Sequence, residues 1–79
     1  MIIMNIQDFV VNFANQFDDT ELEVFVPETR FRDLEEWSSL TGLAVLNMIA
    51  KKYEVKITPA ELKSVETVEA LYNLVASKK

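Results

Sequence analysis

The sequence contains no cysteine and no histidine. Without cysteine, the chain has neither a disulfide framework nor a thiolate metal site. Without histidine, it lacks the side chain that most often serves as a general base and as a nitrogen ligand for metals. No serine can therefore be activated by an imidazole, and no other residue shows the surroundings of a catalytic group. We expect no metal site, no catalytic residue and no enzymatic activity.

Basic residues are also few, because 8 Lys and Arg stand against 13 Asp and Glu, which gives a net charge of −5. An acidic chain is repelled by the phosphate backbone, so we expect no nucleic-acid partner. It favours proteins that present Arg and Lys. No apolar run approaches the length of a membrane span, and the segment Met1–Asn5 lacks the features of a signal peptide. We expect a monomer located in the cytoplasm.

The length of 79 residues fits one domain covering residues 1–79. Apolar residues recur at helical spacing over residues 6–17, directly after Asn5 as an N-cap. Residues 18–37 form a long connection that Pro27 interrupts. A connection of this length needs apolar anchors or a function of its own. The expected anchors are Val24, Phe25, Phe31 and Leu34.

Three further helices follow this connection. The second helix is capped by Ser38 or Ser39 and runs to about Tyr53, with apolar residues on most sides, which is typical of a central helix. The residues Thr58–Glu61 predict a capping box at the start of a short helix. Thr67 is the expected cap of the last helix. The sequence therefore predicts an all-α four-helix bundle, with three longer helices, one short helix and a long first loop.

A serine at a helix start is most often only an N-cap, but Ser39 belongs to a longer pattern. Phe31-x-x-Leu34 lies before Ser38-Ser39-Leu40, and the apolar residues Val45, Ile49 and Tyr53 and the segment Thr67-Val68-Glu69-Ala70-Leu71 lie after it. In order and spacing, these motifs resemble the acyl and peptidyl carrier protein family. In that family, a serine that opens the second helix carries phosphopantetheine.

The resemblance implies an acyl-carrier-like bundle, with 4′-phosphopantetheine from coenzyme A attached covalently to Ser39. Ser38 flanks this position where the family has Asp, and one extra residue between Leu34 and Ser39 accommodates Trp37. Modification of Ser38 instead would restore the upstream spacing but shift every downstream apolar position, so Ser39 is favoured. The start of a helix also suits an attached phosphate, because its N–H groups and dipole favour negative charge.

The apolar residues of the second helix fall on two stripes. One contains Ser39, Leu43, Leu46 and Ala50, and the other contains Val45, Ile49 and Tyr53. The resemblance implies that the second stripe faces the core, which leaves the first beside the attachment site as a docking surface. The alternative is that both stripes are buried. The residues that we expect to dock partners are Leu40, Leu43, Leu46, Trp37, Glu35 and Glu36.

The sequence thus predicts an acyl or aminoacyl carrier that holds its cargo as a thioester on phosphopantetheine. The implied partners are a phosphopantetheinyl transferase and the enzymes that load and process the cargo. No Asp or Glu lies between Leu40 and Tyr53, so we expect a specialised pathway rather than general fatty-acid synthesis. The alternative is an unmodified helical adaptor with the same fold, which binds a protein partner.

Overall fold

The computed structural model describes residues 5–79. Residues 1–4 lie outside the described residues. The expectation that the first residues do not form a signal peptide concerns this segment. The described part of the chain is helical, and its only β pairing is an isolated bridge between Arg30 and Thr67. The all-α prediction with three longer helices and one short helix is confirmed. The helices are α1 (Ile6–Ala14), α2 (Ser39–Tyr53), α3 (Pro59–Lys63) and α4 (Val68–Ser77), with the 3₁₀ turns η1 (Leu22–Val24) and η2 (Phe31–Asp33) in the first loop.

The helix starts follow from side chains that cap free backbone N–H groups. Asn5 caps α1, where its Oδ1 accepts a bond of 2.8 Å from the amide of Gln7. Thr58 and Glu61 form the predicted capping box of α3, with reciprocal bonds of 3.1 and 3.0 Å. Thr67 caps α4 through its hydroxyl. Each of these caps lies where the sequence predicts it.

The first helix is shorter than its apolar pattern predicts. The pattern continues to Phe17, whereas α1 ends at Ala14. Phe17 is nevertheless buried, because a turn in which its amide donates to the carbonyl of Ala14 at 3.0 Å brings it back to the core. Buried residues therefore continue beyond the end of the helix. The apolar spacing alone does not distinguish a longer helix from a helix that is followed by a buried turn.

The first loop is anchored to the core and to α4. Phe25 and Phe31 are buried, but Val24 is 47% exposed, so its expected role as an anchor is wrong. Val24 belongs to η1, which leaves it on the solvent side of the turn. The carbonyl of Thr29 accepts a bond of 3.1 Å from the amide of Val68, which ties the loop to the start of α4. Leu34, half-buried, packs against the core.

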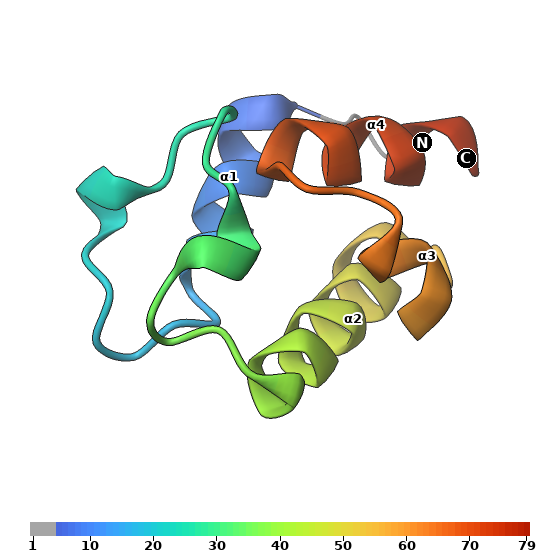
Figure 1. Cartoon of the computed structure of the whole chain (residues 1–79). Coiled ribbons are helices and arrows are strands. Elements are labelled where there is room, and N and C mark those ends of the chain that lie inside the picture. Colours follow the sequence, from blue (N-terminus) through green and yellow to red (C-terminus); the bar gives the residue numbers. More distant parts are fainter. Residues whose placement is uncertain (1–4) are drawn as a thin grey trace.

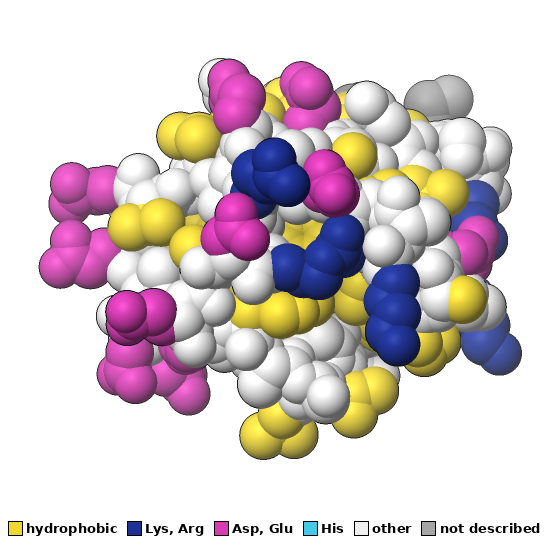
Figure 2. Space-filling view, viewed as in Figure 1, with side chains coloured by type: hydrophobic (Ala, Val, Ile, Leu, Met, Phe, Trp, Pro, Cys, Tyr) yellow, Lys and Arg dark blue, Asp and Glu magenta, His cyan; other side chains and the backbone are white. Residues whose placement is uncertain are grey.

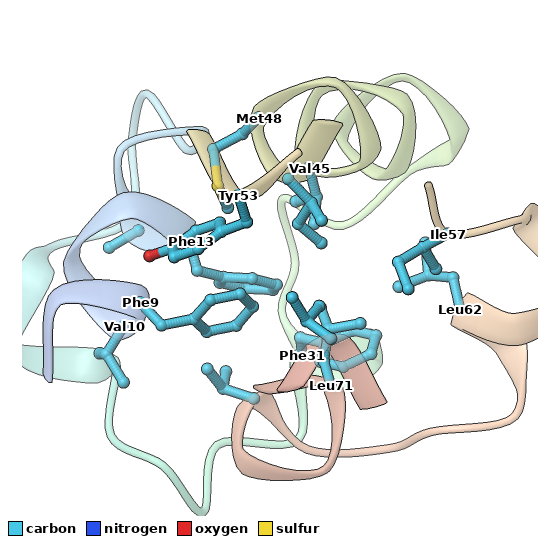
Figure 3. Close-up of a cluster of buried hydrophobic side chains, with 14 of the residues drawn as sticks. Phe9, Val10, Phe13, Phe31, Val45, Met48, Tyr53, Ile57, Leu62 and Leu71 are labelled. Carbon is cyan, nitrogen blue, oxygen red and sulfur yellow. The ribbon is translucent and has the colours of Figure 1, made fainter. Parts of the chain in front are cut away.

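The core lies where all four helices and the loop meet. Figure 1 shows α1 and α4 side by side, with α2 across the bundle from them and α3 between α2 and α4. In Figure 3, side chains from these elements point toward one another. Aromatic rings dominate the centre, and the centroids of Phe13 and Phe31 lie 5.5 Å apart. The side chains with no exposed surface are Phe9, Phe13, Phe31, Val45, Ile49, Val68, Leu71 and Val75.

Candidate functional site

The start of α2 assigns different roles to the two serines. Ser38 is the N-cap: its backbone is extended, and its Oγ accepts a bond of 3.3 Å from the amide of Thr41. The hydroxyl of Thr41 lies 3.2 Å from the same Oγ and donates to the carbonyl of Glu36 at 3.0 Å. The sequence left open which serine caps the helix, and the structure shows that Ser38 does. Its hydroxyl is thereby engaged in the local fold.

Ser39 is the first residue of α2 and is exposed. Within residues 5–79, its hydroxyl makes no hydrogen bond. It lies at the positive end of the helix dipole, where a bound phosphate is favoured. Ser39 therefore offers a free hydroxyl oxygen at a position that suits a phosphodiester.

Trp37 precedes the cap and packs against the aromatic core. Its ring centroid lies 4.9 Å from that of Phe31 and 6.3 Å from that of Phe17. The amide of Trp37 donates to the carbonyl of Leu34 at 3.0 Å, so a tight turn takes up the extra residue before the helix. Half-buried, the indole is held in place and still has an exposed side.

A groove of about 490 Å³ opens beside Ser39, between η2, α2 and α3. Its size is in the range of small-molecule sites. Figure 2 shows hydrophobic side chains in the middle of this face with Lys and Arg beside them, whereas Asp and Glu gather mostly on the side of the first loop. The groove is lined by Arg32, Trp37, Ser38, Ser39, Gly42, Leu43, Leu46, Pro59, Leu62 and Lys63.

The two apolar stripes of α2 face different surroundings. Val45 and Ile49 have no exposed surface, as the resemblance implied. In the first stripe, which is the outer one, Leu43 is 54% exposed and Leu46 is half-buried against the core, and Leu40, outside both stripes, is 77% exposed. The alternative in which both stripes are buried therefore does not hold. Whether the outer stripe docks partners stays a prediction.

The two carboxylates that were predicted to dock partners differ in their contacts. Glu35 is exposed. The carboxylate of Glu36 accepts bonds from the amides of Asp18 and Asp19 at 2.6 and 3.0 Å and from the hydroxyl of Thr20 at 2.7 Å. The bond from Thr20, together with those from the amides, lowers the pKa of Glu36 from its ordinary value of 4.5. Docking through Glu36 would have to compete with these internal bonds.

Sequence reasoning did not find the groove itself. Arg32 from η2 and Leu62 and Lys63 from α3 lie in it beside Ser39, although the three segments are far apart in the sequence. No local spacing links η2, α2 and α3, so only the folded arrangement reveals this set. The described residues contain no group of His, Cys, Asp or Glu that could hold a metal ion. None of the helices in residues 5–79 is both long and apolar enough to cross a membrane.

Comparison with known families agrees with this geometry. The model of a family described as the phosphopantetheine attachment site matches residues 8–75. The match covers most of the 79 residues, so the chain belongs to the phosphopantetheine-binding carrier family. The cofactor of such a domain is 4′-phosphopantetheine, attached covalently. Carrier domains are generally non-catalytic and work with a phosphopantetheinyl transferase and biosynthetic enzymes. No curated protein and no solved structure matches the chain.

Proposed function

We propose that this chain carries an acyl or aminoacyl group as a thioester on phosphopantetheine attached to Ser39. The observation that supports Ser39 is the division of roles at the start of α2. The hydroxyl of Ser38 caps the helix, whereas that of Ser39 is exposed and makes no bond within residues 5–79. Modification of Ser39 would therefore leave the cap intact. Modification of Ser38 would place the phosphodiester on the oxygen that accepts the capping bond, and replacing such a cap by alanine costs about 0.5–2 kcal/mol in other helices.

Attachment needs only a nucleophilic oxygen from this chain. The oxygen of Ser39 forms a bond to the phosphorus of coenzyme A, the bond from that phosphorus to the adenosine bisphosphate breaks, and the serine proton passes to a base on the transferase. The positive end of α2 stabilises the phosphodiester that results. The chain needs no histidine for this step, because the transferase supplies the base. The chain itself is thus a carrier and not an enzyme.

Partners dock, in this proposal, on the outer side of α2 near Ser39. Leu40 and Leu43 are the most exposed apolar side chains there, and exposed apolar groups next to a reactive position suit transient protein contacts. Trp37 and Leu46 extend the surface into the groove, and the exposed Glu35, two residues before Trp37, adds a negative charge. The helix presents no acidic side chain of its own, which favours partners of a specialised biosynthetic pathway. We propose that the protein acts as a monomer in the cytoplasm.

Intact mass measurement tests the attachment site. The purified protein is incubated with coenzyme A and a broad-specificity phosphopantetheinyl transferase. One phosphopantetheinyl group should be added to the natural protein and to Ser38→Ala, and none to Ser39→Ala. Thermal melts of both variants show that they are folded, with Ser38→Ala less stable because its cap is lost.

Two results would contradict the proposal. Labelling that persists in Ser39→Ala would move the attachment to another residue. If the natural protein accepts no group from any transferase, the unmodified adaptor would replace the carrier as the best reading of this fold.

A further inference from the structure

The groove beside Ser39 combines an apolar floor with two cationic side chains. Arg32 and Lys63 line it together with Trp37, Gly42 and Leu62. Two free cations at one site are notable in a chain with a net charge of −5. They point to a ligand that is partly apolar and partly anionic.

Within residues 5–79, Arg30 and Lys78 are the cations that pair with carboxylates, whereas Arg32 and Lys63, like the remaining lysines, form no ion pair. Arg30 lies 3.5 Å from Asp33 and 3.4 Å from Glu66, and Lys78 pairs with Glu61. Across residues 5–79, neither Arg32 nor Lys63 has a carboxylate oxygen within 4.0 Å. The charges in the groove are therefore available to an incoming anion.

The exposed side chain of Arg32 makes two contacts with the fold. Its Nη1 donates to the carbonyl of Leu62 at 3.2 Å, and its central carbon lies 5.3 Å from the centroid of the Phe31 ring. This bond uses one of the five N–H donors of the side chain. Because the planar fork of the remaining donors suits a carboxylate, the restrained side chain loses less conformational freedom when an anion binds.

We propose that the cargo of this carrier bears a carboxylate, which binds to Arg32 and Lys63 while the apolar part of the cargo lies on Trp37, Gly42 and Leu62. The proposal rests on the proposed function, since the cargo reaches the groove through its attachment to Ser39. A tethered group has an effective concentration of the order of millimolar. Weak ion pairs are therefore sufficient to keep the cargo in the groove for part of the time.

The test compares two cargoes of nearly equal shape that differ in charge. The protein is loaded by a transferase from glutaryl-coenzyme A or from the corresponding terminal amide, and intact mass confirms each product. Trp37, the only tryptophan, reports occupation of the groove through its fluorescence, and the amide resonance of Gly42 gives a second signal. An exposed ion pair shifts an equilibrium about 1.5- to 5-fold, so the acid should occupy the groove more than the amide by about that factor.

Three variants assign the difference to the cations. Lys63→Gln and Arg32→Gln should each reduce the difference between the acid and the amide. Lys63→Gln is the safer variant, because the described structure shows no bond from its side chain, whereas Arg32 also contacts Leu62 and Phe31. Lys52→Gln, an exposed lysine of α2 outside the groove, is the matched control and should keep the full difference. High salt should reduce the difference in the natural protein.

Each outcome bears on one proposal. Failure to load either cargo contradicts attachment at Ser39 and hence the proposed function. If both cargoes are loaded but give equal signals, the proposal of an anionic cargo is wrong, whereas the proposal of attachment at Ser39 is not affected. Signals that fall equally for both cargoes in Lys63→Gln would show that the cations bind the phosphate of the arm, which also overturns it.

Discussion

Gly42 offers a substitution whose effect on stability follows from measured contacts. It lies in the first part of α2, is buried, and forms part of the groove. A methyl group added there would lie 3.5 Å from Cζ2 of Trp37 and 3.6 Å from Cδ2 of Leu62. These are ordinary van der Waals distances, so Gly42→Ala fits without displacing either neighbour.

The expected result of Gly42→Ala is a gain in stability. Glycine is less favourable than alanine inside a helix by about 0.8–1.0 kcal/mol, and the added methyl group gains contacts at the distances above. Because the position is close to the helix start, we expect a gain of about 0.5–1 kcal/mol. In a domain of this size, that corresponds to a rise in Tm of about 3–6 °C. Thermal melts followed by circular dichroism measure it directly.

Gly42→Val is the matched control. A Cβ at this position is already in van der Waals contact with Trp37 and Leu62, so we expect the two further carbons of valine to crowd these side chains, and overpacking costs about 1–3 kcal/mol. A loss of stability in Gly42→Ala similar to that in Gly42→Val would refute the reasoning, because it would mean that the methyl group does not fit. If the carrier proposal is also correct, Gly42→Ala should narrow the groove and weaken the fluorescence response of Trp37 to attached cargo.

Two further predictions concern the core and the first loop. Ile49→Ala should destabilise the fold by about 2–5 kcal/mol. Leu43→Ala should cost clearly less stability, because the side chain of Leu43 is 54% exposed. Equal losses of stability in thermal melts of the two variants would mean that the outer stripe is buried. Because the pKa of Glu36 is lowered in the folded state, its bonds to the first loop should stabilise the fold above pH 4.5 and be lost as the pH falls through the folded pKa. Glu36→Gln should therefore lower Tm at pH 7 and matter progressively less below pH 4.5, and a Tm difference that is independent of pH would contradict this.

Features that depend on a few neighbouring residues could be predicted from the sequence. The capping box of Thr58 and Glu61 needs only residues three apart and forms as predicted. Helical spacing places Val45 and Ile49 on one stripe of the second helix, and the family resemblance implied that this stripe faces the core, where both residues are buried. The shape of the first loop could not be predicted, because it depends on distant partners such as Val68, whose amide binds the carbonyl of Thr29. For the same reason, no local signal shows that Glu36 binds the amides of Asp18 and Asp19.

In the candidate site, too, some features depend on neighbouring residues and others on residues that are distant in the sequence. The position of Ser39 at the start of α2 follows from its neighbours in the sequence, because the cap, the first turn and the apolar stripe are all local. The groove requires η2, α2 and α3 to meet, and Arg32 and Lys63 become neighbours of Ser39 only through the packing of Leu62 against the rest of the core. The sequence can therefore indicate which serine lies at the start of the second helix, whereas the side chains that line the neighbouring groove depend on tertiary structure.

The neutral residue at position 38 connects the departure from the family motif with the charges of the groove. Asp and Ser are comparable N-caps, so Ser38 retains the structural function that an aspartate has at this position. Ser38 also lines the groove that contains Arg32 and Lys63. A carboxylate there would compete with an anionic cargo for these cations, whereas a hydroxyl leaves both charges available. Serine in place of the usual Asp thus preserves the N-cap of α2. In our proposal, it also leaves Arg32 and Lys63 free to bind an anionic cargo.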